Sequence, residues 1–394
     1  MAVSGRKAGG TKLGLQFRRI LTLTVFLPVA QASEILKTIH VDHAFRYDGG
    51  EWEIVIHGND GDPDLDPEQA VMVVVDQPFP DRGGRVVRPA GSQWDFLGVG
   101  ANEDLWLIPQ AYTPWLWPGW RTEGFFAEYY DDDPRLGFTS RFVKISLQGV
   151  MYSGSGEGQF SIWSNQTGGV IKQWMSSADG ISEEDAYYFS SGHAHNNFGF
   201  SDPGVYRVDY KASAFLSNDG GGLPVGTSPV ESPVQSFYYA VGTFAEWKAN
   251  HFEPHQLIDE NPDDGIPEVA HYHADTDNDG TGLLLEYAFN LLPQERDAQV
   301  LVPGSGTSGL PTVFLAQSES GPVLVIEYLR RRASGAPRLN YHPEFSSTLD
   351  TGWTVGESEM VSPVDETWER VRVEDPEPFG GGSSRFGRVR VELW

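Results

Sequence analysis

The sequence predicts an all-β protein with an N-terminal β-sandwich, a short helical linker that carries a calcium loop, and a smaller C-terminal β-sandwich domain. Short β-type runs recur between turn residues, and the chain has 45 Gly and 26 Pro to supply those turns. Helical patterns are nearly confined to one internal stretch. With 394 residues, of which 39% are hydrophobic, the chain can bury cores in about two or three domains.

The N-terminal domain is expected over residues 33–243. Several of its apolar runs alternate apolar with polar residues, which is the two-residue period of a half-buried strand. Repeated short strands separated by turn residues are typical of a sandwich or a barrel. The clearest runs are Glu51–His57, Ala70–Val75, Phe142–Leu147, Gly158–Trp163 and Gly204–Tyr210.

The linker is expected over residues 244–295 and the C-terminal domain over residues 296–394. Phe244–Phe252 has the pattern of a short helix, and Leu283–Leu292 predicts a second helix that Pro293 stops. The β pattern then resumes, which predicts the smaller β domain. Its runs are Val323–Leu329, Arg338–His342, Arg370–Val373 and Phe386–Leu393.

Residues 1–32 have the features of a secretory signal peptide. They carry five basic residues and no acidic one, with an apolar stretch from Ile20 to Ala30 and a small-x-small cleavage signature at Ala30-Gln31-Ala32. The apolar stretch is too short for a bilayer, which takes about 20 residues. We therefore expect a secreted protein, extracellular or periplasmic, without a membrane span in the mature chain; association with the cell surface stays open.

Charge and composition exclude several classes of protein. The 28 Lys+Arg against 55 Asp+Glu give a net charge of −27, a field that repels nucleic acid and anionic lipid. The absence of Cys excludes disulfide scaffolds, thiolate metal sites and cysteine nucleophiles. The motifs G-x-S-x-G and H-E-x-x-H are missing, as is a phosphate-binding glycine loop with its lysine. We therefore expect a protein that is not an enzyme.

An acidic loop is the strongest local motif. Gly280 permits its sharp turn, the carbonyl of Thr281 supplies one ligand, and Glu286 closes the shell with both oxygens. This predicts a structural Ca²⁺ in a half-site or dockerin-like loop; the alternative is a solvated acidic turn without an ion. The residues that fit the D-x-[DN]-x-[DN]-G-x5-E pattern are Asp275, Asp277, Asp279, Gly280 and Glu286.

A second acidic run lacks the glycine and the terminal glutamate in register, and it is expected to be a solvated loop. Its members are Asp60, Asp62, Asp64 and Asp66.

A His-x-His pair lies at His193 and His195. In a strand, residues i and i+2 lie on one face, so both imidazoles point the same way. Neutral ring nitrogens at this spacing suit a transition metal. On these residues alone, the alternative of two exposed histidines without a metal stays open.

The segment from His193 to Tyr206 resembles the repeat of bacterial surface-anchored proteins known as choice-of-anchor M domains, first noted in actinobacteria. The shared pattern is His-x-His, an aromatic pair, and Pro-Gly-x-Tyr before a strand, although Phe198 stands where the family usually has Trp. The resemblance covers about residues 38–215. Its other stretches are His40-Val-Asp42, Leu107–Gln110 with Trp117–Trp120, and Ser176–Gly180.

This resemblance implies a role in capturing or handling a transition metal outside the cell, because family members are similar to proteins encoded beside metal-type ABC transporters. It implies His193 and His195 as ligands of Zn²⁺, Mn²⁺ or Fe²⁺, with His40 and Asp42 as completing ligands. We therefore expect His40 or Asp42 to fold against His193. The alternative is that these polar residues hydrogen-bond to one another and stiffen the sandwich.

The second half of the chain resembles the C-terminal module of many secreted proteins from Verrucomicrobia-like bacteria. This resemblance implies an extracellular accessory or sorting-type region. The stretches that carry it are the helix around Trp247, the Asp275–Glu286 loop, Glu286–Phe289 and the Arg385–Leu393 strand.

Four tryptophans crowd one segment, and they either stack on sugar rings when exposed or fill a core when buried. We interpret them as packing residues. They are Trp106, Trp115, Trp117 and Trp120.

The expected function is that of a secreted or cell-surface, non-catalytic metal-binding protein. Its expected partners are metal ions and either a cell-surface transporter system or a glycan. One alternative is a carbohydrate-binding or adhesion module, which predicts an exposed tryptophan platform and histidines that do not converge. The other is a metal-dependent enzyme, which predicts convergent ligands in an open cleft.

Overall fold

The computed structural model describes residues 33–59, 61–79, 83–127, 143–189, 192–218, 224–259, 271–318, 321–356, 359–377 and 384–394. The protein is mostly β, with 47% strand, 10% helix and several sheets, which confirms the predicted fold class. The predicted signal peptide lies outside the described residues. The division into domains and the sandwich arrangement stay predictions.

The first sheet has the strand order β1-β4-β17-β15-β9-β12, with β16 paired to β15. Its two parallel pairs, β1 with β4 and β4 with β17, bring the first strands of the chain beside later ones. The bounds are β1 Glu34–Leu36, β4 Ala70–Val74, β9 Val143–Gly154, β12 Ala186–Phe189, β15 Gly204–Ala214, β16 Val230–Glu231 and β17 Gln235–Val241.

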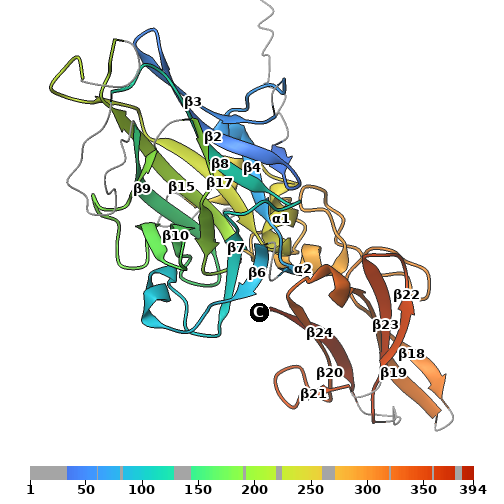
Figure 1. The fold of residues 1–394 in the computed structure, drawn as a ribbon. Coiled ribbons are helices and arrows are strands. Elements are labelled where there is room, and N and C mark those ends of the chain that lie inside the picture. Colours follow the sequence, from blue (N-terminus) through green and yellow to red (C-terminus); the bar gives the residue numbers. More distant parts are fainter. Residues whose placement is uncertain are drawn as a thin grey trace, which may run out of the picture. The chain divides into compact units, whose positions relative to one another are not determined.

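The second sheet has the order β11-β10-β14-β7-β6-β5 and the third has the order β13-β8-β2-β3. In the third sheet, β8 runs parallel to β2, and each residue of β2 pairs with the residue 77 positions later in β8, as His40 does with Trp117. Figure 1 shows β2, β3 and β8 side by side. The bounds are β2 His40–Asp48, β3 Glu51–His57, β5 Pro78–Phe79, β6 Gly83–Val87, β7 Asp104–Ile108, β8 Trp117–Glu123, β10 Phe160–Asn165, β11 Ile171–Ser176, β13 Gly192–Ala194 and β14 Asn197–Phe200.

One apolar core joins these three sheets. Strand β2 shows how the sequence builds it: Val41, His43 and Phe45 alternate along the strand and are at most 1% exposed on the core side. His40 and Asp42 are offset from this set by one residue and therefore belong to the opposite face. This alternation places His40 and Asp42 on the face opposite the core, while His43 is a polar residue buried within it.

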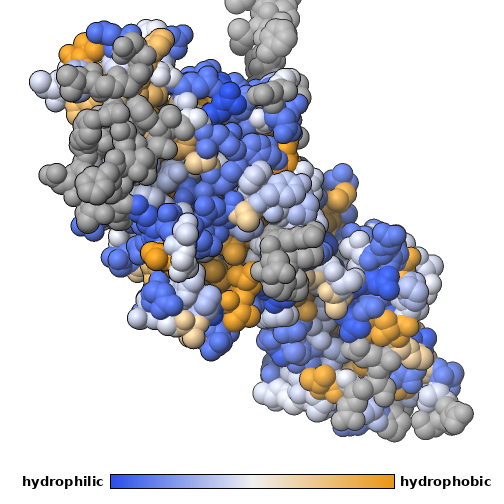
Figure 2. All heavy atoms as spheres, viewed as in Figure 1, coloured by the Kyte–Doolittle hydropathy of each residue, from blue (hydrophilic) through white to orange (hydrophobic). Residues whose placement is uncertain are grey.

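The tryptophan segment is partly core. Trp106 and Trp120 are buried, which confirms their interpretation as packing residues, while Trp115 and Trp117 are half-buried. The Trp120 indole N–H donates to Asn196 Oδ1 at 2.9 Å, so the largest core side chain of β8 also fixes the segment after the His-x-His pair. The face shown in Figure 2 is mostly hydrophilic, in keeping with the high net charge.

Two short α-helices confirm the predicted helical stretch between the β regions. Helix α1 spans Thr243–Ala249 and α2 spans Leu283–Phe289, so the predicted end of the second helix at Leu292 is wrong. The helix ends because Asn290 adopts the left-handed conformation (φ 60°, ψ 45°), which Asn tolerates better than most residues. The short 3-10 helices are η1 Pro67–Gln69, η2 Ser92–Leu97, η3 Pro254–Leu257 and η4 Ala333–Gly335.

The C-terminal β region contains two further sheets, with orders β18-β19-β23-β22 and β21-β20-β24. Its apolar side chains pack with those of α2 into a separate cluster that includes Ile326, Tyr328 and Val371. The bounds are β18 Thr312–Ser318, β19 Gly321–Arg331, β20 Leu339–Ser346, β21 Thr354–Val355, β22 Glu359–Pro363, β23 Trp368–Glu374 and β24 Phe386–Leu393. Among the described helices, none is long and apolar enough to cross a membrane.

A buried histidine ties β2 to two other strands. The Nδ1–H of His43 donates to the carbonyl oxygen of Gly119 in β8 at 2.9 Å, and its Nε2 accepts from the hydroxyl of Tyr239 in β17 at 2.7 Å. Burial lowers the pKa of His43 to about 4, so the ring is neutral at pH 7 and both nitrogens are satisfied. This hydrogen bond fixes the position of the Gly119 backbone relative to β2.

Replacement of Tyr239 by Phe tests this contact. The variant leaves a buried imidazole nitrogen without its donor, which costs about 1–3 kcal/mol of unfolding free energy. Tyr112→Phe is the control, because Tyr112 is 71% exposed and its change stays within about 0.5 kcal/mol. Urea denaturation of both variants measures the difference, and equal stabilities would contradict the structural role of the His43 contact.

Candidate metal centres

Three histidines from two separate parts of the chain converge on the outer face of the third sheet. His40 begins β2, His193 lies in β13, and His195 follows that strand. One ring nitrogen from each lies within 4.8 Å of those of the other two. We call these residues, together with Asp42, the histidine centre.

The shortest contacts of the histidine centre involve His193. Its Nε2 is 3.1 Å from Nε2 of His40 and 3.0 Å from Oδ1 of Asp42. The same Asp42 oxygen is 3.5 Å from Nε2 of His40. The prediction that His40 or Asp42 folds against His193 is therefore confirmed for both residues.

Strand register explains why these side chains meet. Asp42 of β2 is paired with Gly119 of β8, and His193 of β13 is paired with Arg121 two residues further along β8. Paired residues project to the same face of a sheet, and so do residues two apart in one strand. The side chains of β2 and β13 consequently lean towards each other across β8.

Gly119 leaves the space in which the side chains of Asp42 and His193 approach each other. A Cβ atom at this residue would lie 2.3 Å from Oδ1 of Asp42 and 3.0 Å from Nε2 of His193. These separations are too short for non-bonded atoms, so only a glycine leaves room for the cluster.

The observed separations match those of ligands around one small cation. Two ligand atoms at about 2.0–2.1 Å from a tetrahedral zinc ion are about 3.3–3.4 Å apart. The measured distances among His40, Asp42 and His193 are 3.0, 3.1 and 3.5 Å. A cation therefore fits between these atoms with small adjustments of side-chain torsions.

His195 is oriented by its surroundings. Its Nδ1–H donates to the carbonyl oxygen of Pro118 at 3.0 Å, which leaves the lone pair on Nε2. This Nε2 is buried and has no hydrogen-bond partner in the part of the chain that the structure describes. The indole ring of Trp117 stacks on the imidazole at 3.7 Å between centroids and 3° between planes. A fixed tautomer with an unused buried lone pair is what a metal ligand requires.

Burial also sets the protonation states. It lowers the pKa of His195 to about 4, and it lowers the pKa of His40, where the neighbouring His193 and His57 add to the effect and Asp42 opposes it. Burial raises the pKa of Asp42, while His193 and His40 oppose that shift. His40 and His195 are therefore neutral at pH 7, so a metal ion does not have to displace protons from these two rings.

One side of the histidine centre opens to solvent. His40, Asp42 and His193 line a surface pocket of about 560 Å³, whereas His195, which stacks on Trp117, is not part of its lining. The other lining residues are Gly58, Asn59, Arg121, Thr122, Glu123 and Gly192. Convergent ligands beside an open pocket are also what a metal-dependent enzyme has, and that alternative stays a prediction.

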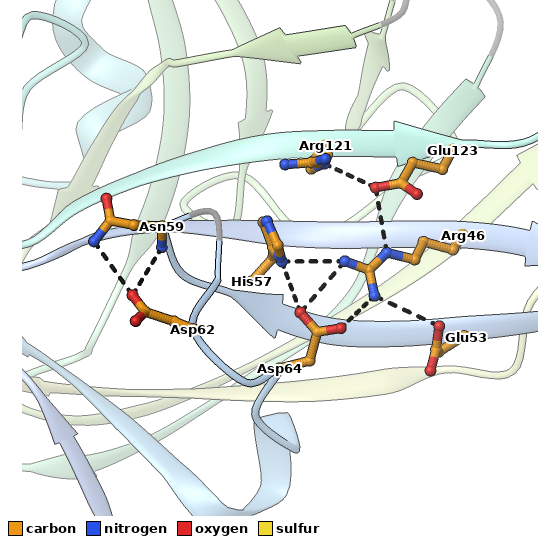
Figure 3. Close-up of polar contacts among 8 residues, drawn as sticks. All are labelled: Arg46, Glu53, His57, Asn59, Asp62, Asp64, Arg121 and Glu123. Atoms are coloured by element: carbon orange, nitrogen blue, oxygen red, sulfur yellow. Dashed lines mark hydrogen bonds and ion pairs between the residues drawn. The ribbon is translucent and has the colours of Figure 1, made fainter.

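The sequence did not predict the roles of two backbone positions in the histidine centre. Gly119 and Pro118 act through the backbone, and only the Trp117–Trp120 motif pointed to their segment. The second acidic run lies in an exposed loop as predicted at Asp62, Asp64 and Asp66, while Asp60 lies outside the described residues. The prediction did not include the contacts of Asp64, which accepts hydrogen bonds from Arg46 and lies 2.7 Å from Nδ1 of His57. Figure 3 shows these side chains together on the face of the third sheet.

The acidic loop curls as predicted. Carboxylate oxygens of Asp275, Asp277 and Asp279 lie within 4.8 Å of one another. Backbone N–H groups of Asp279 and Gly280 donate to Asp275 at 3.1 and 3.0 Å, and Gly280 has the positive φ of 96° that the turn requires. The N–H of Thr281 donates to Asp279 Oδ1 at 2.8 Å, while a ligand role for its carbonyl oxygen stays a prediction.

Glu286 supplies an independent sign of a cation. The residue is 0% exposed, and neither carboxylate oxygen has a hydrogen-bond partner among the described residues. Burial raises its pKa to about 8, with further contributions from the carboxylates of the loop. A buried, unpaired carboxylate facing three others is unfavourable unless a cation neutralises it.

Asp297 joins this loop although no motif predicted it. The segment after α2 folds back, so that the Ala298 N–H donates to Asp279 Oδ2 and the Arg296 Nε–H donates to the Asp277 carbonyl, both at 2.8 Å. Oδ1 of Asp297 is buried without a partner in the described ranges. Burial raises the pKa of Asp297, and the charge of Asp279 adds to this shift. Asp297 is therefore a further candidate calcium ligand.

Comparisons with known proteins do not place the chain in a family: no family model matches it, and no curated protein matches it. The resemblances to choice-of-anchor M domains and to the C-terminal module of Verrucomicrobia-like proteins therefore stay predictions.

Gly119→Ala tests whether the histidine centre depends on the bare backbone of β8. The added methyl group pushes Asp42 and His193 apart, and we expect Zn²⁺ affinity to fall about tenfold or more, about 1.4 kcal/mol. Isothermal titration measures the affinity. Gly335→Ala is the control, because a Cβ there meets no atom within 4 Å. Unchanged affinity in Gly119→Ala would contradict the geometry.

The acidic loop predicts that the stability of the protein without Ca²⁺ decreases as the pH rises. Because the folded pKa of Glu286, about 8, exceeds its ordinary value of 4.5, the protonated carboxyl stabilises the fold fully below about pH 4.5. That contribution is lost as the pH rises through about 8. In EDTA the melting temperature should therefore fall over this range, and Ca²⁺ should restore it. Glu286→Gln should remove both effects, whereas the exposed Glu157→Gln should keep them.

Asp297→Asn should weaken Ca²⁺ binding by about tenfold, because one of the carboxylates around the ion loses its charge. Titration with a calcium indicator measures the change. Asp179→Asn, in an exposed turn elsewhere, is the matched control. Equal calcium affinities in the two variants would exclude Asp297 from the shell.

Proposed function

We propose that this chain is a secreted, non-catalytic metal-binding protein that holds a divalent transition metal at His40, Asp42, His193 and His195 and is stabilised by Ca²⁺ at the acidic loop. The observation that carries the proposal is the convergence of three imidazole nitrogens, from His40 and from the distant His193/His195 pair, within 4.8 Å of one another. Asp42, 3% exposed, adds a carboxylate oxygen at the same point.

The donor set favours zinc. Three imidazoles and one carboxylate form a nitrogen-rich, four-coordinate shell, which suits Zn²⁺. Mn²⁺ prefers more oxygen ligands, and both Mn²⁺ and Fe²⁺ rank below Zn²⁺ in affinity for a given site of this type. We therefore expect Zn²⁺ to bind most tightly of the three.

Three further features support an extracellular role in metal handling. The signal-peptide pattern of residues 1–32 supports export. The net charge of −27 raises the local concentration of cations around the protein. The resemblance to choice-of-anchor M domains supports cooperation with a metal transporter at the cell surface.

The carbohydrate-binding alternative receives less support. It requires an exposed tryptophan platform and histidines that lie apart. Trp106 and Trp120 are at most 1% exposed, Trp117 stacks on His195, and the histidines converge.

Metal analysis of the purified protein tests the proposed function. After EDTA treatment, exposure to Zn²⁺ and gel filtration, elemental analysis should find about one zinc per wild-type chain. The double variant His193→Ala/His195→Ala should retain almost none. The matched control is His255→Ala/His342→Ala, which changes two histidines outside the centre. Equal zinc in the wild type and the His193/His195 variant would refute the proposal.

A further inference from the structure

We infer that a second surface pocket binds a small oxyanion, a carboxylate or a phosphate, through the guanidinium of Arg331. We call this pocket of about 520 Å³ the arginine pocket, because Arg331 and Arg332 both line it. It shares no lining residue with the pocket of the histidine centre. The site needs no metal ion, so the inference goes beyond the proposed function and does not depend on it.

The first argument is that Arg331 is held in a fixed position. It ends strand β19, and its Nε–H donates to the carbonyl oxygen of Tyr287 in α2 at 2.7 Å. Its Cζ lies 3.8 Å from the centroid of the Tyr287 ring and 4.5 Å from that of the buried Trp368 ring. Such contacts between a guanidinium and aromatic rings are attractive. They position the guanidinium without supplying a full negative charge.

The second argument is that Arg331 has unused donors. The contact with Tyr287 uses one of the five N–H donors of the guanidinium. In the part of the chain that the structure describes, neither Nη1 nor Nη2 has a hydrogen-bond partner, and no carboxylate forms an ion pair with this side chain. The preceding Arg330, in contrast, pairs with Glu369 at 2.7 Å. Because neither terminal nitrogen of Arg331 is fully buried, both remain accessible from the pocket.

The third argument is that this cation is largely removed from water. Burial lowers the pKa of Arg331, and the hydroxyl groups of Tyr287 and Tyr341 oppose this shift. The guanidinium nevertheless stays charged at pH 7. A partly buried charge without a counter-charge is unfavourable, so an anion that binds here offsets part of the desolvation cost.

The fourth argument is the charge of the lining, which contains three cations and two carboxylates. Lys37 and Glu246 form an ion pair, which leaves the two arginines and Glu366. Arg332 donates to the backbone carbonyl of Asp365 at 2.8 Å, an acceptor without a full charge. The lining side chains therefore carry an excess of positive charge. The net charge of −27 opposes it only weakly, because exposed charges more than about 8 Å apart are largely screened at physiological ionic strength.

The chemistry of the ligand follows from the shape of the guanidinium. Its planar pair of terminal N–H groups matches two oxygen atoms of one carboxylate or phosphate. The hydroxyls of Ser334 and Thr367 line the same pocket and can donate to a further oxygen, while Trp247 and Pro337 add an apolar wall. The volume of about 520 Å³ lies in the range of small-molecule sites.

Ligand-observed NMR of the full-length protein provides the test. Saturation transfer to acetate in one arm, and broadening of the phosphorus signal of inorganic phosphate in the other, should give a saturable response in at least one arm. The arm with the higher affinity identifies the class of oxyanion. The double variant His193→Ala/His195→Ala should respond as the wild type does, because neither histidine lines the arginine pocket.

Arg331→Gln should bind the responding anion about tenfold more weakly or worse, because it removes the charge and the planar fork. Arg388→Gln is the matched control. The Cζ of Arg388 also lies over an indole ring, 4.0 Å from the centroid of Trp353, but its Nε–H already donates to Glu344 at 2.8 Å. This control should bind the anion as the wild type does.

A second pair of variants keeps Arg331 unchanged and decides the question if Arg331→Gln does not fold. Ser334 is an exposed residue of the lining, so its replacement leaves the fold intact. Ser334→Glu adds a carboxylate that competes for the guanidinium and should weaken anion binding severalfold. Ser334→Gln, which is similar in size and uncharged, should bind the anion almost as tightly as the wild type.

The absence of a saturable response in both arms would overturn the oxyanion site. A folded Arg331→Gln variant that binds the anion as tightly as the wild type would do the same, and so would equal affinities of the two Ser334 variants. Loss of binding in the His193/His195 variant would place the anion at the histidine centre instead. Zinc binding is measured separately, so the proposed function and the arginine pocket can fail independently.

Discussion

The parallel pairing of β2 with β8 is the constraint on which the histidine centre depends. This pairing sets Asp42 opposite Gly119, and Gly119 is held from both faces of the sheet. On the core side its carbonyl oxygen accepts from His43, and on the outer side its missing side chain leaves room for Asp42 and His193. A shift of β8 by one residue would turn these contacts to the opposite faces. The apolar core therefore fixes the geometry of a polar site.

The two candidate centres differ in the charges that they bring together. The histidine centre is built from imidazole rings and one carboxylate that lie within hydrogen-bonding distance of one another, so it is stable as a hydrogen-bonded cluster when no metal is bound. The acidic loop gathers like charges around Glu286, which has no hydrogen-bond partner among the described residues. It consequently needs a cation for its own stability. This difference favours a structural role for calcium and an exchangeable role for the transition metal.

Much of the fold and part of each centre could be predicted from the sequence. The alternation of apolar and polar residues within β3 and β15 is local, and so are the continuous apolar run of β4 and the spacing of the acidic loop. His193 and His195 share a motif, whereas their approach to His40 depends on strand pairing across some 150 residues, which no local pattern reveals. Gly119, Asp297 and the pair of His57 with Asp64 were missed for the same reason: their roles arise from contacts distant in sequence.

X-ray absorption spectroscopy at the zinc edge tests the central claim most directly, because it reports the atoms around the ion without reference to function. Convergence of three histidines predicts a shell of nitrogen and oxygen atoms at about 2.0–2.1 Å, with the multiple scattering that imidazole rings produce. A shell made only of oxygen atoms, without imidazole scattering, would contradict the account.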